Sequence, residues 1–367
     1  MRRRPQTIVT TVGTLLAASA IAAPSAMAAD PSQYCGNSTL TQIFDGTGTA
    51  EPMASSGLLG LSDPELFKSA YNEWVMLAAG LDEGSPNSGI DIYASWLGAS
   101  EPLSSAATDW TIGNTPLVAR PSSGAWDDFG IETPSFVWTG SESRIYYTGS
   151  DDAYDHQDDP GANFAIGYMR WNGSAWERHG DPVIEAYHSW ESWNGYDFVL
   201  EPAIRKYGSS YYMQYGAGDP SGASADHGGM ATATSTDGVS WPTANRELTW
   251  DAYDVKIVAG FSFWTSNHEN VNSRYETVFG TLGNALVSWA GIWWAESDTA
   301  SQDPSDFTTF THLAQTSAST GLDWHDDKMF APTFKYEDNK IWVFFRAVDG
   351  DNGPGRPHIG RFYCSTA

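Results

Sequence analysis

Short segments of aromatic and β-branched residues, bounded by polar turns, recur along most of the chain. Segments 144–149, 211–215 and 341–345 are examples, and Gly, Asn, Asp or Ser separates such segments from their neighbours. Residues of the first kind favour half-buried strands, and residues of the second kind favour turns. The pattern therefore predicts an all-β protein built from many short strands.

The strand pattern also repeats. In four places a proline near the start of one predicted strand is followed by an aromatic second strand and then a third, and these prolines are Pro64, Pro134, Pro202 and Pro332. The first three are 70 and 68 residues apart, and the last step of 130 residues is close to two such steps. We therefore place a degenerate unit without the proline at Ile257–Trp264, Tyr275–Gly280 and Gly291–Glu296.

Five units of about 67 residues predict a single five-bladed β-propeller, because units of three or four strands repeated radially form blades. A β-sandwich would not explain the equal spacing. Segment Thr39–Phe44 is expected to add the strand that closes the ring beside Cys364. A proline suits a strand entrance, where its missing N–H costs little. No linker or low-complexity segment divides the chain, so residues 29–367 are expected to form one domain.

The first residues have a different character. Arg2–Arg4 is basic, Ile8–Ala23 is apolar, and Ala26–Ala28 has the small-x-small pattern of a cleavage site. These features predict a secretory signal peptide over residues 1–28, with cleavage after Ala28. The protein is therefore expected to be secreted.

Two cysteines, Cys35 and Cys364, lie at the two ends of the expected mature chain. A disulfide is chemically reasonable in an exported protein, and we favour it over two unpaired thiols. Such a bond would tie the N-terminus to the C-terminus, as a closed ring requires.

Composition and charge narrow the range of functions. The chain has 367 residues, 17 Trp and 17 Tyr, and a net charge of −26 from 45 acidic and 19 basic residues. Abundant aromatics with modest charge exclude a disordered protein. Phosphate backbones and anionic lipids repel so acidic a protein, and no second apolar run is long enough to span a membrane. We therefore expect a monomer with neither nucleic acid nor membrane as a partner.

Candidate catalytic residues stand where the inner strands of a propeller begin, because these positions converge on one central funnel. Asp63, Thr133 and Glu201 directly precede the repeat prolines, and Glu132 lies one residue earlier with the opposite strand parity. Five residues before the proline stand Asp197 and Asp327. Crowded carboxylates push their pKa values apart, so a neutral acid and an ionised base can coexist for glycosidic bond cleavage.

Aromatic residues near the same end of the strands fit a sugar ligand. Four tryptophans lie just upstream of inner strands, where their faces could stack on sugar rings: Trp126, Trp190, Trp193 and Trp324. We take Trp126 and Trp193 as substrate-binding candidates, together with His227 in a polar loop and Asp45 in the Gly-rich turn after the closing strand. The acids Asp197 and Asp327 are further substrate-binding candidates, although solvated loop acids are the plainer interpretation.

Metal binding is weakly indicated. The Asp-rich segment 151–159 lacks the Gly-centred spacing of an EF-hand, and His227 beside Gly-Gly is more typical of a turn. We therefore predict no required cofactor and assign no metal ligand, while a structural Ca²⁺ would be compatible with the fold.

The chain resembles the five-bladed propeller glycosidases, a group that includes glycoside hydrolase families 43, 62, 32, 68 and 130. The resemblance rests on the Asp-Pro strand, the aromatic second strand, the Ile-Gly-Tyr-like third strand and the Ser235–Trp241 segment, and it covers about Leu61 to Phe362. In those enzymes an Asp opening the first blade is base or nucleophile, and a Glu before a later inner strand is the general acid. The resemblance implies these roles for Asp63 and Glu201. A third carboxylate in those enzymes often tunes the acid or holds the sugar, and Glu132, Asp197 and Asp327 are the candidates for that role, with Glu132 taken as a catalytic residue.

Some features depart from those families. The Trp-Met-Asn-Asp-Pro-Asn motif of family 32 is absent, which disfavours fructan cleavage. The family 43 acid usually lies in the fourth blade, where the substitute Glu269 is expected in a loop on the wrong side. Bacterial endo-D-arabinanases are also five-bladed propellers, and their N-terminal aspartate pair would correspond to Asp45 and Asp63.

Two classes of function follow. The first is a secreted glycosidase acting on furanoside-rich polysaccharide, above all arabinan with L- or D-arabinofuranosyl linkages, and otherwise β-mannoside, galactan or fructan. The second is a carbohydrate-binding propeller that has lost catalysis. A six-bladed, sialidase-like propeller is disfavoured, because we count five units and find no cluster of arginines at strand starts.

Overall fold

The strands form where aromatic and β-branched residues gather, as the sequence pattern predicts. The computed structural model describes residues 30–46, 52–53, 56, 58–82, 89–152, 161–218, 229–251, 266–271, 274–281, 291–298, 307–315, 328–348 and 357–366. The expected signal peptide and the candidates His227, Asp327 and Trp324 lie outside these residues. Within them strands make up most of the regular secondary structure and the helices are short 3₁₀ turns, which confirms the predicted all-β class.

The first two sets of strands form one eight-stranded sheet. The first set comprises β2(Leu58–Lys68), β3(Trp74–Asp82), β4(Ile90–Trp96) and the short β5(Thr111–Ile112). The second set comprises β6(Gly130–Trp138), β7(Ser143–Ser150), β8(Phe164–Trp171) and β9(Trp176–Arg178). A single parallel pair, Ile90 with Gly130, joins the two sets, whereas every other pairing in the sheet is antiparallel.

Three further sheets have four antiparallel strands each. One contains β12(Val199–Tyr207), β13(Ser210–Ala217), β14(Gly229–Ser235) and β15(Arg246–Asp251). The next contains β16(Ser266–Val271), β17(Arg274–Thr281), β18(Gly291–Ser297) and β19(Phe307–Gln315). The last contains β20(Lys328–Glu337), β21(Lys340–Val348), β22(Pro357–Ser365) and the N-terminal β1(Thr41–Phe44).

Several short elements lie outside these four sheets. A two-stranded hairpin consists of β10(Ser192–Trp193) and β11(Tyr196–Asp197). The 3₁₀ helices are η1(Cys35–Ser38), η3(Ala107–Asp109), η4(Ser189–Glu191) and η5(Thr243–Asn245).

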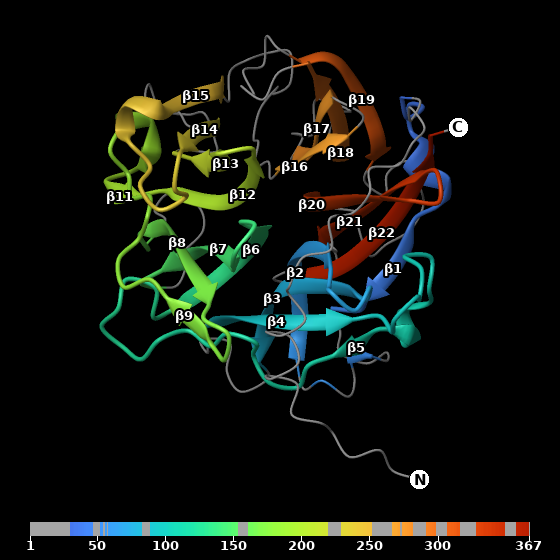
Figure 1. Cartoon of the computed structure of the whole chain (residues 1–367), viewed down its shortest axis with the longest axis horizontal. Coiled ribbons are helices and arrows are strands. Elements are labelled where there is room, and N and C mark those ends of the chain that lie inside the picture. Colours follow the sequence, from blue (N-terminus) through green and yellow to red (C-terminus); the bar gives the residue numbers. More distant parts are fainter. Residues whose placement is uncertain are drawn as a thin grey trace.

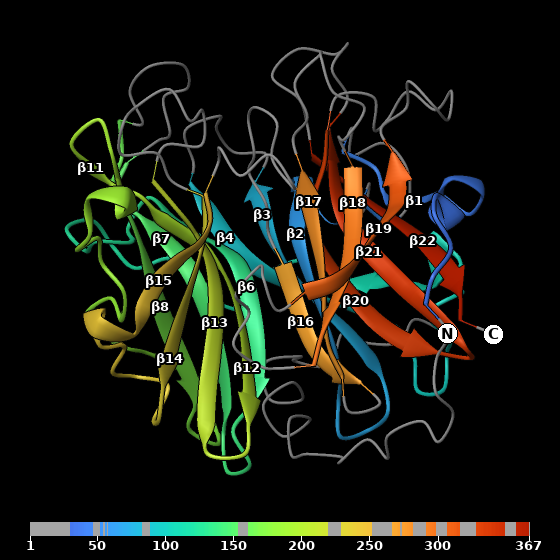
Figure 2. The same cartoon turned by 90° about the horizontal axis from the view of Figure 1, so that it is seen from above.

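The sheets are arranged radially. Figure 1 shows β2, β6, β12, β16 and β20 facing the centre, and Figure 2 shows these strands running roughly along the viewing direction of Figure 1. Apolar clusters lie between neighbouring sets of strands: one joins β3 and β4 to β7 and β8, and another joins β7 and β8 to β12, β13 and β14. Further clusters join β17 and β18 to the last sheet, and the last sheet to β2 and β3. Burial of this apolar surface between sheets is the main stabilising contribution to such a fold.

The two ends of the chain meet in the last sheet. Strand β1 pairs antiparallel with β22. A strand within the predicted segment Thr39–Phe44 therefore lies beside the strand that contains Cys364, as expected. A disulfide joins Cys35 to Cys364, as predicted. The first strand to enter the fold is therefore held beside the last one to leave it.

Two details differ from the sequence-based expectation. The first described strand of the degenerate unit is β16 at Ser266–Val271, whereas the predicted segment Ile257–Trp264 lies outside the described residues. Glu269 therefore belongs to a strand, and the expectation of a loop there was wrong. Asp197 pairs in the β10–β11 hairpin and not in the inner strand β12. In both places residues that favour turns lie in or next to the strand, so the residue types did not show where the strand begins.

In the described part of the chain, no helix is both long and apolar enough to cross a membrane.

Candidate active site

Four inner strands share an irregularity at the repeat prolines. In β2, β6, β12 and β20 the pairing register shifts across the Xaa-Pro dipeptide, so that two residues oppose one on the neighbouring strand. This is the geometry of a β-bulge, which re-aims side chains. The bulged non-glycine residues have positive φ angles: Asp63 (54°), Thr133 (47°), Glu201 (57°) and Ala331 (48°).

This conformation is costly, and it recurs. A non-glycine residue rarely has positive φ, and a following proline further disfavours helical conformations. Such strain persists only where the surrounding structure enforces it, and it gathers at functional sites. Its repetition in four strands around one centre marks the ring of bulges as a candidate site.

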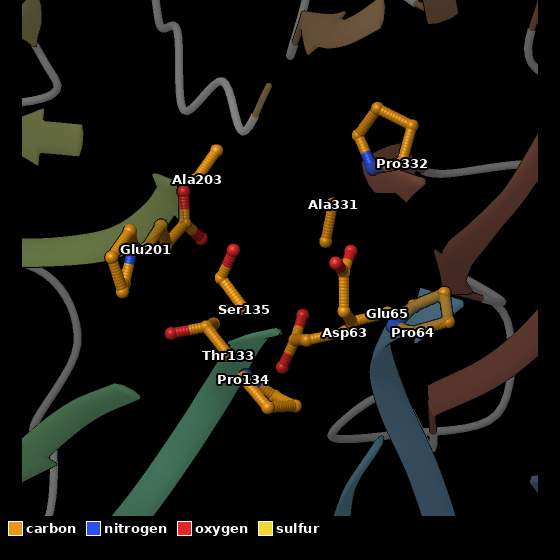
Figure 3. A pocket seen from close by; sticks show the side chains of 11 residues that line it. Asp63, Pro64, Glu65, Thr133, Pro134, Ser135, Glu201, Ala203, Ala331 and Pro332 are labelled. Carbon is orange, nitrogen blue, oxygen red and sulfur yellow. The ribbon is translucent and has the colours of Figure 1, made fainter. Parts of the chain in front are cut away.

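The bulges build one pocket on the axis of the molecule. Figure 3 shows its side chains converging from β2, β6, β12 and β20. The lining consists of the bulged residue, the proline and the next residue of β2, β6 and β12, and of the first two of these in β20: Asp63, Pro64, Glu65, Thr133, Pro134, Ser135, Glu201, Pro202, Ala203, Ala331 and Pro332. Asp63 and Glu201, more than 130 residues apart in sequence, therefore lie in the same pocket.

The carboxyl of Asp63 is buried and held by two neighbours. Its residue is only 4% exposed, Ser62 donates a hydrogen bond to Oδ2 at 2.8 Å, and Arg346 Nη1 lies 3.6 Å from Oδ1. Oδ1 accepts no hydrogen bond from the described residues. Ser62 and Arg346 therefore hold the Asp63 carboxyl from two sides, one at each oxygen.

The carboxyl of Glu201 has different surroundings. It is 8% exposed, and its Oε2 has no hydrogen-bond partner in the described part of the chain. Burial, followed by the negative charges of Asp63 and Glu132, raises the pKa of Glu201 well above its usual range, and Arg346 offsets part of this rise. Glu201 therefore favours the neutral, proton-carrying form.

Glu132 completes the acidic cluster from the strand beside Asp63. Burial, followed by the charge of Asp63, raises the pKa of Glu132 to about 7, again offset in part by Arg346. Glu132 itself does not line the pocket, because the bulge that follows it breaks the alternation of β6 and presents Thr133 instead. Its charge nevertheless acts on Glu201.

Glu65 forms the layer beneath Asp63. It is 3% exposed, and its carboxylate accepts hydrogen bonds from Phe136 N–H at 3.4 Å and from the Thr333 hydroxyl at 3.1 Å. Arg205 Nη1 lies 3.5 Å from Oε1. These partners come from β6, β20 and β12, so one carboxylate ties three other inner strands to β2.

The ties between inner strands follow a rule. In three cases the N–H two residues after a repeat proline donates to the side chain that follows the proline of the neighbouring inner strand. The pairs are Leu66 with Thr333 at 3.4 Å, Phe136 with Glu65 at 3.4 Å, and Ile204 with Ser135 at 3.0 Å. These N–H groups lie just beyond the register shifts, and a side chain of the neighbouring inner strand satisfies each of them.

Two of the predicted substrate-binding acids, Asp45 and Asp197, do not line this pocket. Asp45 lies 4.0 Å from Nδ1 of His358, beside the closing strand. Asp197 is half-buried in the β10–β11 hairpin, where burial and then the charges of Glu191 and Asp151 raise its pKa. Neither side chain belongs to the pocket lining.

The two tryptophans predicted to bind substrate, Trp126 and Trp193, pack against other aromatic rings. Trp126 stacks on Tyr147 with 5.9 Å between ring centroids, and its indole N–H donates to Gly180 O. Trp193 meets Phe198 edge-on at 5.3 Å. Both remain partly exposed, so their role as sugar platforms stays a prediction.

Sequence reasoning missed Glu65 and Arg346. A signal for Glu65 was present, because it follows Pro64 at the position that Ser135, Ala203 and Thr333 hold in the other repeats. Arg346 lies in the second strand of its sheet, and its pairing opposite Phe330 is what brings it to Asp63. No spacing in the sequence indicates that contact.

Among the residues that the structure describes, no three His, Cys, Asp or Glu side chains form a group that could hold a metal ion. We therefore assign no residue of this pocket to a metal.

Comparison by sequence gives no match with protein-family models or with curated proteins. Solved structures do match. An α-L-arabinofuranosidase from Lactobacillus brevis superposes with a TM-score of 0.59 at 11% identity, over 83% of this chain and 90% of that chain. A thermostable family 43 glycoside hydrolase gives 0.56 at 10% identity, over 83% and 88%. The catalytic domain of a Coprinopsis cinerea family 62 α-L-arabinofuranosidase gives 0.55 at 9% identity, over 91% and 98%.

The chain has the fold of the propeller glycosidases. The resemblance inferred from the repeat is thereby confirmed at the level of architecture. At such low identity the match concerns the fold alone, so activity must be argued from the pocket.

Proposed function

We propose that the protein is a secreted glycoside hydrolase that cleaves arabinofuranosyl linkages in arabinan-type polysaccharide. One observation carries the proposal: Asp63 and Glu201 occupy equivalent bulges of one pocket, where Asp63 lies beside a guanidinium and the pKa of Glu201 is raised well above its usual range. Two carboxyl groups kept in different protonation states are what glycosidic bond hydrolysis requires.

Glu201 acts as the general acid in this proposal. Its raised pKa keeps a proton that it donates to the glycosidic oxygen as the bond to the sugar breaks. Asp63, beside Arg346, is the carboxylate that either attacks the anomeric carbon or takes a proton from an attacking water. In the first route Asp63 displaces the leaving sugar, and water then displaces Asp63 while Glu201 takes the proton of that water. In the second route water displaces the leaving sugar directly and Asp63 takes its proton. In both, the leaving sugar gains the proton of Glu201 and the anomeric carbon gains the hydroxyl of water.

Glu132 is the third carboxylate. Its charge raises the pKa of Glu201 without its side chain lining the pocket, so its contribution is electrostatic. Asp45, Asp197, Asp327, Trp126, Trp193 and His227 stay predictions for the outer part of the substrate site.

The rest of the proposal concerns the molecule around the pocket. Residues 29–367 form a single five-bladed propeller, in which the β2, β6, β12, β16 and β20 units each supply one blade, and the protein acts as a monomer outside the cell after loss of residues 1–28. The pairing of β1 with β22 and the disulfide support a closed ring and export. Two of the matched structures are α-L-arabinofuranosidases, which supports arabinose as the sugar.

The test is hydrolysis of a panel of polysaccharides by the mature protein. The panel contains L-arabinan, D-arabinan, arabinoxylan, β-mannan, galactan and levan. We expect release of sugar from an arabinose polymer, and a loss of about 10²–10⁴-fold or more in kcat/KM in Asp63→Asn and Glu201→Gln. Glu177→Gln, a change at an exposed carboxylate on β9, is the matched control and should retain full activity.

Aryl arabinofuranosides separate the two roles. A good leaving group needs little protonation, so Glu201→Gln should recover much of its activity on such substrates, whereas Asp63→Asn should not. Equal losses on both substrate types would refute the acid assignment. Binding without cleavage across the whole panel would favour a carbohydrate-binding propeller, and cleavage of mannan, galactan or levan alone would replace the proposed sugar.

A further inference from the structure

The backbone of Glu201 is held in a way that the repeat does not explain. The register of β12 and β13 passes from the Leu200–Gly216 pair to the Ala203–Gln214 pair, so the bulge leaves the Glu201 N–H outside the ladder. That N–H donates to the Thr148 hydroxyl at 2.7 Å. Thr148 lies on β7, in the second strand of the preceding repeat, and is fully buried.

This contact differs from the repeated ties between inner strands. Those ties use the N–H two residues after the proline and a side chain of the preceding inner strand, as Ile204 and Ser135 do. The Glu201 contact uses the N–H of the bulged residue itself and a side chain one strand further out. It therefore acts on the residue whose carboxyl enters the pocket.

A second hydroxyl extends the contact back to the pocket. Thr148 Oγ1 lies 2.5 Å from Thr133 Oγ1, so one of these hydroxyls donates to the other. Thr133 is the bulged residue of β6 and lines the pocket with Glu201. A chain of two hydroxyls thus connects the pocket wall of one repeat with the backbone of Glu201 in the next.

We propose that Thr148 is a positioning residue that orients the Glu201 carboxyl by holding the Glu201 N–H, with Thr133 fixing the Thr148 hydroxyl. The inference rests on the proposed role of Glu201 as general acid. Positive φ is unfavourable for a glutamate before proline, so the bulge needs an external restraint. The hydroxyl of Thr148 supplies that restraint from a buried strand whose own position is fixed by packing. An acid displaced by about 1 Å can lose on the order of 10²-fold in rate.

The test compares Thr148→Val with Thr148→Ser. Valine keeps the shape but offers the Glu201 N–H no acceptor, whereas serine restores the hydroxyl. We expect kcat on arabinan to fall about 10–100-fold in Thr148→Val with KM changed by less than about threefold, and serine to recover most of the loss. The alkaline limb of the pH–rate profile reports ionisation of the general acid. Its midpoint should shift in Thr148→Val and return to the wild-type pH in Thr148→Ser.

Thr277→Val is the matched control. Thr277 is also fully buried on a second strand, and its hydroxyl donates to Gln214 Oε1 at 3.3 Å, away from the pocket lining. It reports the general effect of removing a buried threonine hydroxyl, and should leave kcat and the alkaline limb unchanged. Should Thr148→Val fail to fold, Thr148→Ala and Thr133→Val, measured in the same way, replace it.

A readout that does not need activity separates this inference from the proposed function. NMR titration of ¹³C-labelled glutamate carboxyls gives the pKa of Glu201 in the wild type and in each variant. A Glu201 pKa and pH profile that do not move in Thr148→Val would overturn the inference even in an active enzyme. A pKa that moves in Thr148→Val and returns in Thr148→Ser would support it even if no polymer on the panel were cleaved, a result that would refute only the proposed function.

Discussion

Asp63 and Glu201 share a backbone conformation and a pocket, but their neighbours differ. Asp63 has a hydroxyl donor and a guanidinium beside it, whereas Glu201 is buried next to two other acids. Donors and positive charge stabilise an ionised carboxylate, while burial and negative charge stabilise the neutral acid. The immediate surroundings, and not the residue types, therefore assign the proton to Glu201.

Replacing Glu132 by Gln should change how stability depends on pH. Glu132 has its pKa raised to about 7 in the folded protein, whereas an unfolded glutamate ionises near its ordinary value of 4.5. Between these values the folded state holds more protons, so the free energy of unfolding falls as pH rises from about 4.5 to about 7. Urea unfolding at several pH values should show a smaller fall in Glu132→Gln. The same fall in both proteins would contradict the raised pKa.

Replacing Arg346 by Met should extend activity to higher pH. Arg346 lowers the pKa of Glu201 and of Glu132, so its removal raises both further. The alkaline limb of kcat/KM reports ionisation of the acid and should move upward, while the maximal rate falls because Asp63 loses its ion pair. Arg346→Lys keeps the charge and serves as the control. A limb that stays in place in Arg346→Met would show that the guanidinium does not act on Glu201.

At the scale of the element, the bulges give the inner strands their function. Each bulge inserts one residue into its strand and directs the bulged residue toward the pocket; these residues are Asp63, Thr133, Glu201 and Ala331. The bulge also interrupts the pairing with the second strand of the sheet. Just beyond three of the bulges, N–H groups are satisfied by the neighbouring inner strand, through Thr333, Glu65 and Ser135. The segment of each strand that presents a pocket residue is therefore also tied to the strand beside it.

Ser135→Ala should measure one such link. The change leaves the buried N–H of Ile204 without its acceptor, which costs about 1–3 kcal/mol in the free energy of unfolding. Chemical denaturation monitored by tryptophan fluorescence measures this cost, with Ser122→Ala at an exposed position as the control. A cost within experimental error of the control would mean that the tie does not contribute to stability.

At the scale of the whole molecule, the two ends of the chain are held together. Strand β1 completes the last sheet, the Cys35–Cys364 disulfide spans 329 residues of sequence, and one apolar cluster joins the last sheet to β2 and β3. Because β2 carries Asp63, these contacts also keep one wall of the pocket in place.

The double variant Cys35→Ala/Cys364→Ala should lose about 2–5 kcal/mol in the free energy of unfolding, mainly because the unfolded chain regains the freedom of a very long loop. Its activity at low temperature should persist, since β1 and its apolar contacts remain. Thermal and chemical unfolding of the oxidised wild type and of the variant measure the difference. Equal stabilities would show that packing alone closes the fold.

The sequence by itself determined the strands, the repeat and the closing disulfide, because each follows from local residue types or from spacing. The Xaa-Pro dipeptides even located Asp63 and Glu201, since the repeat places them at equivalent positions. Only the tertiary structure decided which other residues join them. Arg346, Glu65 and Thr148 reach the site through cross-strand register and through packing between sheets. Asp45 and Asp197 are placed elsewhere by the same contacts. A bulge shifts side-chain direction by one residue, and that shift depends on pairing between strands that the sequence pattern does not encode.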